Sequence, residues 1–464
     1  MGFKGYMFGR RKGMLSLKYI RADPEKYIKN ESARFRDPKI IDRILEMDKR
    51  WSRLNFIKEK NVTIKNMISG LLKKKVEGVG DSDNMEIIYG QLFEYLEKKQ
   101  GGKAKELLGM YAEENGVDGL VRLGRYVDKI SVDESELVGG ERDKLVDSLC
   151  GLLHESVPID NNEDNNVVVF CNGSGEKKLL GHVELGKKYK LIDTKRGAKI
   201  AGNRGYFLTG MGVRLNMALM MYAMDFLSDR GYTGMSVPHF MNGSVAEKLC
   251  QLQEYDETLY KLNTAETDPK YLIATSEQPL TGYYMDHKFA ADELPVKLAG
   301  YSTCYRKETG RSGVDTLGIF RVHQFEKVEQ LCITDEKGSW SMMEDMISIS
   351  KEFYDTLGIK YRVINIVSGA LNNAAAKKYD LEGYFASTGN YRELVSCSNC
   401  TDYFSRKLNI KDKHGNFVHI LNSTLCANTR TICCLLEQHQ TAEGILIPEV
   451  LRKYIHGYTD IYIR

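Results

Sequence analysis

The sequence predicts an α+β protein, in which an antiparallel β-sheet flanked by helices is joined to an N-terminal helical hairpin. Two stretches in the first third of the chain repeat apolar residues every three or four positions, as paired helices do. Further along, residues 296–308 and 319–332 alternate their side chains with period two around a glycine-rich turn, as a β-hairpin does. The polar run 160–166 indicates a linker. We therefore expect a helical arm over residues 1–165 and a second domain over residues 166–464.

The composition is that of an ordinary globular chain, with 42% hydrophobic and 28% charged residues and a formal net charge of +3. The charge is unevenly distributed, because residues 26–75 contain fifteen Lys or Arg against six Asp or Glu. Ten cysteines are too few for a disulfide scaffold, and the adjacent pair Cys433 and Cys434 suits a reducing compartment. No apolar run reaches the roughly 18 residues of a membrane span. We expect a cytoplasmic protein that does not bind membranes.

The arm is predicted to contain two helices, over about residues 38–76 and 120–154, that pair antiparallel through apolar seams. Each helix would be about 50 Å long at 1.5 Å per residue. The irregular segment 77–119 would form the tip and include a short helix near residues 85–99. A basic first helix suits a nucleic-acid backbone, because neutralised phosphates release counterions. A dimerisation coiled coil with a solvated charged face is the alternative.

The predicted hairpin contains an unusual set of polar side chains. Arg306 and Glu308 project from one side of its first strand, since every second residue shares a face. One face of the second strand carries Arg321, His323, Phe325, Lys327 and Glu329. Buried charges are costly unless they have partners. This surface is therefore either a solvated outer face or a binding surface.

Residues 306–308 (RKE) and 318–330 (GIFRVHQFEKVEQ) resemble motif 2 of the class II aminoacyl-tRNA synthetases and, more narrowly, the seryl-tRNA synthetases of eukaryotic type. Other stretches are similar to the same family in its own order: motif 1 over 207–240, an amino-acid loop over 272–280, a metal and ATP strand over 390–400, and motif 3 over 421–440. The resemblance covers about residues 204–454. It implies a class II catalytic domain built on an antiparallel β-sheet.

The resemblance also implies an activity and a set of partners. Serine and ATP would give seryl-adenylate and pyrophosphate, and the seryl group would pass to the 3′ end of serine tRNA. Selenocysteine tRNA would be charged with serine as well, where the organism has it. The family uses ATP and Mg²⁺, forms homodimers, and holds the long variable arm of serine tRNA on its N-terminal helical arm.

The same resemblance assigns the nucleotide site. Arg306 would span the serine carboxylate and the ATP α-phosphate, because a guanidinium fork can neutralise two anions that otherwise repel each other. Glu308 would meet the adenine amino group, and Phe325 would stack on the adenine ring. Arg321 would lie near the phosphates. Arg430 would bind the γ-phosphate at a helix N-terminus, which itself favours anions.

Glu393 is implied to hold Mg²⁺ between the ATP phosphates with the help of Ser396. Strict alternation along a strand places these two side chains on opposite faces, so their joint action requires a bulge or a bend. The nearby pair Cys397 and Cys400 invites a zinc interpretation. A closed zinc site needs four suitably spaced ligands, and we expect no structural zinc.

The serine site is implied to contain Thr275 and Glu277 around the substrate ammonium, with Glu329, Asn422 and Thr424 lining the remainder. A carboxylate facing a cation is a strong, charge-assisted contact. Thr275 and Glu277 are equally suited to cap the following helix. The motif 3 segment, taken alone, is better explained as an ordinary corner between a strand and a helix.

Two sequence departures and two other functions are weighed against this interpretation. Leu317 stands where the family commonly has Arg, and Asn428 replaces a small or hydroxyl residue. A synthetase-like paralogue that loads a carrier protein or only binds RNA is one alternative, although Arg306, Glu393 and Arg430 argue against an inactive site. A structural coiled-coil protein is the other, and ATP would not raise its thermal stability.

Overall fold

The computed structural model of the chain describes residues 17–74, 78, 80, 84–130, 134–250, 258–308, 317–455, 457 and 460–464. Most of the glycine-rich turn expected after residue 308, and parts of the expected arm tip, lie outside the described residues. The chain divides into two compact units, Pro38–Asp147 and Met1–Asp37 with Ser148–Arg464.

These compact units do not coincide with the expected arm over residues 1–165 and second domain over residues 166–464, and those domain bounds stay a prediction. Residues 17–37 belong to the larger unit, and Arg34, whose side chain is buried, is one of the residues that join them to the rest of it. Its guanidinium donates to the carbonyls of Gly151 at 2.8 Å and Ala375 at 2.6 Å. Carbonyl groups far apart in the sequence thus hold this segment, and no periodicity in the sequence reports such contacts.

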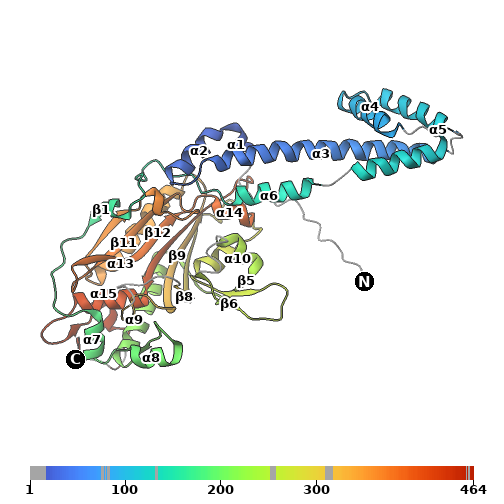
Figure 1. The fold of residues 1–464 in the computed structure, drawn as a ribbon. Coiled ribbons are helices and arrows are strands. Elements are labelled where there is room, and N and C mark those ends of the chain that lie inside the picture. The colour runs from blue at the N-terminus through green and yellow to red at the C-terminus, as the bar shows by residue number, and fades with distance from the viewer. Residues whose placement is uncertain are drawn as a thin grey trace. The chain divides into compact units, whose positions relative to one another are not determined.

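The larger unit is organised around an eight-stranded sheet, which is antiparallel except that β4 runs parallel to β8. This arrangement confirms the predicted α+β class, with a largely antiparallel sheet flanked by helices (Figure 1). In sheet order the strands are β1 (Val167–Cys171), β10 (Tyr361–Asn365), β11 (Lys377–Phe385), β12 (Asn390–Asn399), β13 (His419–Ala427), β9 (Gln324–Thr334), β8 (Val296–Tyr305) and β4 (Thr233–Ser236).

Helices α9 (Met211–Ser228), α13 (Ser339–Thr356) and α15 (Asn428–Gln438) contact this sheet. Their apolar residues join those of the strands in one large core, and every residue of β13 is buried. The remaining described elements of the unit are shorter: α1 (Leu17–Ala22), α2 (Pro24–Ala33), η1 (Glu163–Asn165), α7 (His182–Lys188), β2 (Ile192–Asp193), α8 (Thr194–Ala201), β3 (Phe207–Leu208), β5 (Phe240–Asn242), α10 (Gly243–Leu249), β6 (Lys261–Leu262), β7 (Lys270–Leu272), α12 (Glu277–Tyr283), η3 (Ser368–Ala370), α14 (Tyr403–Leu408), β14 (Ile445–Leu446), α16 (Glu449–Arg452) and β15 (Tyr462–Ile463). Across the described residues, none of the helices combines the length and the apolar character that crossing a bilayer requires.

The β8–β9 hairpin has the register that period two predicts on β9. Phe325, Lys327 and Glu329 share one face, and they lie opposite Cys304, Ser302 and Gly300 of β8, respectively. These small partners leave room above the sheet for the long polar side chains of β9. The strands are shorter than expected, however, so Arg306, Glu308 and Arg321 lie in the connection and not on a strand face.

The arm unit consists, among its described residues, of α3 (Lys39–Leu72), α4 (Met85–Glu97), α5 (Gly101–Ile130) and α6 (Ser135–Asp147). Ion pairs between Arg50 and Glu134 and between Lys65 and Asp128 show that the chain returns antiparallel to α3, as expected. The returning segment is not the single helix expected over residues 120–154. It is divided into α5 and α6, and it begins before residue 120.

The tip of the arm folds back on α3, as Figure 1 shows for α4 and the first part of α5. Tyr89 of α4 donates to Asn61 of α3 at 2.8 Å, which explains a polar residue within the apolar seam. Gly116 breaks α5 with a φ of 60° and a ψ of −161°. A Cβ on Gly116 would lie 2.3 Å from the carbonyl oxygen of Gly78, so only glycine fits at this bend.

Candidate active site

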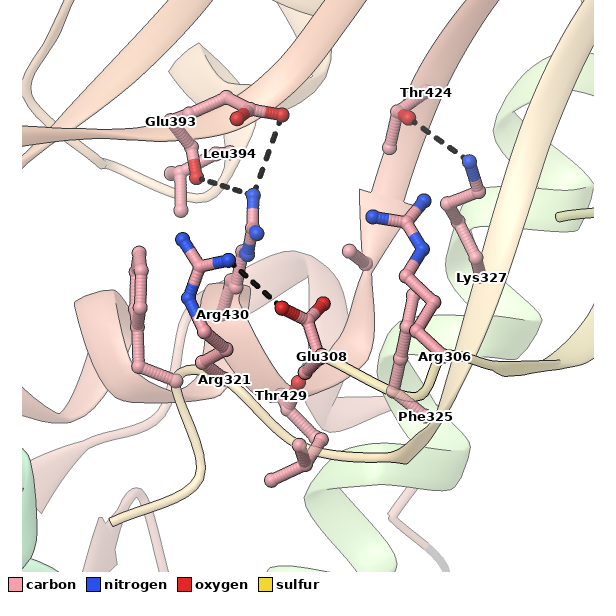
Figure 2. A pocket seen from close by; sticks show the side chains of 13 residues that line it. Arg306, Glu308, Arg321, Phe325, Lys327, Glu393, Leu394, Thr424, Thr429 and Arg430 are labelled. Atoms are coloured by element: carbon pink, nitrogen blue, oxygen red, sulfur yellow. Dashed lines mark hydrogen bonds and ion pairs between the residues drawn. The ribbon is translucent and has the colours of Figure 1, made fainter. Parts of the chain in front are cut away.

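A cavity opens beside the β8–β9 connection, and polar side chains from four parts of the sheet unit converge on it (Figure 2). The contributors are the connection itself, β9, β12, and the corner where β13 enters α15. It is lined by Arg306, Glu308, Phe320, Arg321, Val322, Phe325, Lys327, Glu393, Leu394, Thr424, Ala427, Thr429 and Arg430. The sequence predicted seven of these as site residues: Arg306, Glu308, Arg321, Phe325, Glu393, Thr424 and Arg430.

Three guanidinium groups line the cavity, and each has a protein partner. Arg321 Nη1 lies 2.9 Å from Glu308 Oε2. Arg430 Nη1 lies 3.3 Å from Glu393 Oε1 and donates to the Glu393 carbonyl at 3.3 Å. The Arg306 guanidinium stands 5.3 Å from the centre of the Phe325 ring. These cations line one cavity, and a polyanion that binds there would compete with the carboxylates that Arg321 and Arg430 now contact.

The carboxylates beside these arginines remain ionised. Burial raises the pKa of Glu393, but the opposing charges of Arg430, Lys378 and Arg306 outweigh burial and hold it at about 2. For Glu308, burial acts in the same direction, and the bond from Arg321 more than offsets it, so its pKa also lies below the usual range. The site therefore presents fixed charges of both signs at neutral pH.

A bulge in β12 gives Glu393 and Ser396 a shared face, as their expected joint action requires. Ser396 pairs with Asp380 of β11 and Glu393 pairs with Glu382, so Leu394 is the extra residue between them. Glu393 and Ser396 provide hard oxygen ligands, as Mg²⁺ prefers. The described residues contain no group of three or more His, Cys, Asp or Glu that could hold a metal alone. A Mg²⁺ ion here would need phosphate oxygens to complete its coordination.

Asp380 is a buried carboxylate next to this pair that the sequence analysis missed. Its Oδ2 lies 3.2 Å from Lys378 Nζ. Burial, reinforced by the charge of Glu393, raises the pKa of Asp380 to about 7 against the opposing effect of Lys378. Asp380 is the register partner of Ser396 on the neighbouring strand. The alternation of β11 indicates which face Asp380 shares, but it does not report this pairing.

The two cysteines that raised the question of zinc contact different groups. Cys397 Sγ lies 3.9 Å from the Met343 carbonyl, whereas Cys400 Sγ receives a 3.7 Å contact from Asn422. Both are buried, and burial raises the pKa of each thiol, so both are held as thiols. The absence of a structural zinc stays a prediction.

The expected serine-site residues adjoin the cavity through a network around β13. Asn422 donates to Glu277 Oε1 at 2.8 Å. Two residues further along β13, Thr424 donates to Glu329 Oε2 at 3.2 Å. Thr275 is buried next to Glu277, whose backbone N–H donates to Thr275 Oγ1 at 3.4 Å. Thr424 is the one residue of this network that also lines the cavity of Figure 2.

Lys327 lies on the hairpin face that the sequence predicted, but it was not assigned to the site. Its ammonium forms an ion pair with Glu329 and donates to Thr424 Oγ1 at 3.4 Å (Figure 2). Both charged side chains are almost fully buried, at 5% and 2% exposure. Its place between Phe325 and Glu329 on the same face was the signal that could have identified it.

The two departures in the sequence have local settings. Asn428 is buried at the start of α15, donates to Asn216 Oδ1 at 2.7 Å, and accepts from the Glu326 backbone at 3.0 Å. It therefore joins α9 to β9. Leu317 is exposed within the connection between β8 and β9.

Comparisons with known proteins agree with this geometry. The family model described as tRNA synthetase class II core domain (G, H, P, S and T) matches residues 260–439, and that of the seryl-tRNA synthetase N-terminal domain matches residues 14–89. The serine–tRNA ligase of Helianthus annuus is 43% identical over 94% of this chain and 95% of its own. The cytoplasmic serine–tRNA ligase of Dictyostelium discoideum is 48% identical over 80% of this chain and 83% of its own.

Two solved structures are similar over nearly the whole chain. The cytoplasmic serine–tRNA ligase of Naegleria fowleri in complex with AMP has a TM-score of 0.83 and 40% identity, covering 97% of this chain and 99% of that one. The seryl-tRNA synthetase of Pyrococcus horikoshii complexed with ATP has a TM-score of 0.78 and 32% identity, with the same coverage.

Proposed function

The chain belongs to the seryl-tRNA synthetases, and we propose that the cavity of Figure 2 is where it joins serine to ATP. The protein is a serine–tRNA ligase, so the seryl group of the adenylate passes on to the 3′ end of serine tRNA. The observation that carries the site proposal is that Arg306, Glu393 and Arg430 line one cavity beside the Glu329 and Glu277 networks.

ATP would lie along the arginine end of the cavity. The Phe325 ring would stack on the adenine, and Glu308 would accept a hydrogen bond from the adenine amino group. Arg321 and Arg430 would bind the phosphates, with some release of their present carboxylate partners. A Mg²⁺ ion held by Glu393 and Ser396 would supply further neutralisation of the phosphate charge.

The serine carboxylate attacks the α-phosphorus of ATP, and pyrophosphate leaves. The attacking carboxylate is already ionised, so this step needs no general base. Arg306 would hold the carboxylate and the α-phosphate together, because a planar guanidinium can donate to both anions. Catalysis then comes from positioning and from preorganised positive charge.

Selectivity would arise at the other end of the cavity. Glu277 and Thr275 are placed for the substrate ammonium, and Glu329, Thr424 and Asn422 for its hydroxyl. Alanine lacks this hydroxyl and would leave buried polar groups unpaired, which costs on the order of 10⁴-fold in selectivity. Threonine differs only by added volume, and pocket size rejects such analogues by roughly 10²-fold.

The partners follow from the family and from exposed surfaces. Helix α9 exposes Val213, Met217 and Met221, which recur at four-residue spacing on one stripe. An exposed apolar stripe of this kind suits a second copy of the chain, and we propose a homodimer through α9 and the neighbouring β4. We also propose that the arm unit binds the long variable arm of serine tRNA, and that selenocysteine tRNA is charged where present. The D. discoideum relative is named cytoplasmic, and we propose the same compartment here.

Serine-dependent exchange between ATP and pyrophosphate tests this proposal, followed by charging of total tRNA. The wild-type chain is expected to show both activities, and Arg306→Ala to show neither while keeping its fold. Exchange without charging would instead indicate a paralogue that loads another carrier. If ATP and serine fail to raise thermal stability and no exchange occurs, the assignment of the cavity is wrong.

A further inference from the structure

A strongly basic surface lies outside the cavity, on α7, α8 and the chain around them. Residues 177–204 contain nine Lys or Arg against two Asp or Glu, whereas the whole chain has 66 against 63. Lys187, Lys188, Lys190, Lys195 and Lys199 are all exposed. We name these five the basic band. Within the described part of the chain, no carboxylate forms an ion pair with any of them.

Local helix energetics explain only part of this band. Lys187 and Lys188 end α7, where positive charge is favoured by the helix dipole. Lys195 lies in the first turn of α8, where the same dipole disfavours a cation. Lys195 and Lys199 are four residues apart on one helix face, an arrangement that is destabilising for like charges. Lys199 lies in the last turn of α8, where the dipole favours a cation, so the cost in folding free energy falls on Lys195 and on the repulsion between the two lysines, and an external anion would offset it.

The segment that contains the basic band, residues 182–206, contacts the connection between β8 and β9 at three points. Arg204 donates to the carbonyl of Glu308 at 2.8 Å, and Tyr206 donates to the carbonyl of Gln324 at 3.2 Å. At a third point the two segments approach closely. A Cβ added to Gly318 would lie only 2.8 Å from His182 Nε2. Glu308 lines the cavity, so both ends of the basic segment are anchored to the structure that borders the cavity.

The band is therefore close to the reacting groups without touching them. Lys187 follows His182 by five residues, and Lys199 precedes Arg204 by five. At the helical rise of 1.5 Å per residue, the five residues of α7 span about 7.5 Å, while Lys199 and Arg204 are separated by the end of α8 and the turn that follows it. Neither helix contributes a residue to the cavity. A macromolecule that delivers one end to the cavity would pass over or beside this band.

We propose that the basic band is a docking surface for the phosphate backbone of the tRNA acceptor arm. This inference rests on the proposed function of the cavity. Exposed lysines bind phosphates as point charges and position a duplex without reading its sequence. The duplex next to the 3′ end is A-form RNA, which proteins recognise largely through its shape and backbone. The band would thus hold the acceptor arm while its 3′ end reaches the adenylate.

Two double variants of the full-length protein test the proposal, Lys187→Gln with Lys188→Gln on α7 and Lys195→Gln with Lys199→Gln on α8. The control is Lys337→Gln with Lys413→Gln. Both control lysines are exposed near the opposite end of the sheet, where β9 ends and β13 begins. The measurements are KM for serine tRNA, the Kd for serine tRNA by filter binding at several salt concentrations, and serine-dependent ATP–pyrophosphate exchange.

We expect each band variant to raise KM and Kd for serine tRNA by roughly five- to tenfold and to lower the slope of log Kd against log salt by about one to two. Exchange should stay at the wild-type rate, because no band residue touches serine or ATP. The control variant should match the wild type in every measurement. Serine tRNAs of different sequence should lose affinity equally.

Unchanged tRNA affinity and salt slope in both band variants would overturn the inference, and so would an equal loss in the control. A fall in exchange with unchanged tRNA affinity would also overturn it, because the band would then support the cavity and not the tRNA. Absence of exchange in the wild type would refute the proposed function instead. The filter-binding measurement would still decide whether the band holds RNA.

Discussion

Lys327 offers the sharpest test of the site, because its ammonium is buried and forms an ion pair with one carboxylate, that of Glu329. Lys327→Met keeps the length of the side chain but removes the ammonium that pairs with Glu329 and contacts Thr424. Glu329 is 2% exposed, so its carboxylate would remain buried without an opposite charge. Removing one partner of such a pair costs about 3–5 kcal/mol. We expect the free energy of unfolding of the sheet unit to fall by about 3 kcal/mol.

The same substitution should weaken the selection of serine over alanine. Without the Lys327 ammonium, Glu329 and Thr424 lose the cation that holds them in position, so the hydrogen bond between the serine hydroxyl and this charged acceptor should weaken. Hydrogen bonds to charged groups contribute about 1–1.5 kcal/mol more than neutral ones. That difference corresponds to about a tenfold fall in the ratio of kcat/KM for serine and alanine, since 1.4 kcal/mol is tenfold. ATP–pyrophosphate exchange with each amino acid measures this ratio.

A double-mutant cycle with Glu329→Gln separates the ion pair from simple packing. Replacing both charges leaves no buried unpaired ion, so the double variant should regain most of the stability that Lys327→Met loses. It should not regain selectivity, because the ionised acceptor is then missing. The reasoning would be refuted by a coupling free energy below about 0.5 kcal/mol, or by a serine-to-alanine ratio that Lys327→Met leaves unchanged.

Three further outcomes are expected. Arg306→Lys should lower serine-dependent exchange by roughly 10²-fold or more, because an ammonium cannot bridge two anions as a guanidinium fork does; near-normal exchange would contradict the bridging role. Glu393 has a folded-state pKa of about 2, below its ordinary value, so it stabilises the protein above about pH 4.5 and this contribution is lost as the pH falls toward 2. Urea unfolding at several pH values with EDTA should show this acid sensitivity in the wild type and a flatter profile in Glu393→Gln. Gly116→Ala should destabilise the arm unit by about 1–3 kcal/mol, since φ and the Gly78 carbonyl both exclude a Cβ; amide hydrogen exchange in α4 and α5 measures this, and serine-dependent exchange should not change.

The sequence by itself determined those features that repeat within one segment. The alternation of Phe325, Lys327 and Glu329 was sufficient to place all three on one face of a strand, and β9 has that face. The apolar seam of residues 38–76 likewise predicted α3 as one long helix. The motif residues also indicated the family, because several independent signatures occur in order along the chain.

The interruptions of these patterns were not predictable in the same way. Gly116 breaks the returning helix because it approaches Gly78, a contact between segments that periodicity does not report. The boundary at Asp37 depends on carbonyls that Arg34 reaches on the sheet unit. Each of these features is set by what a residue meets across the fold.

The site itself was decided by the tertiary structure. Period two alone would separate Glu393 from Ser396, and only the bulge at Leu394 gives them a common face. Lys327 acquires its role because β13 places Thr424 beside Glu329, and this neighbour is fixed by strand register. The face on which each side chain of a strand lies follows from the sequence of that strand. The residue opposite it depends on how strands that are distant in the sequence pair. For this reason the residue types of the site could be predicted from the sequence, whereas the ion pairs between them could not.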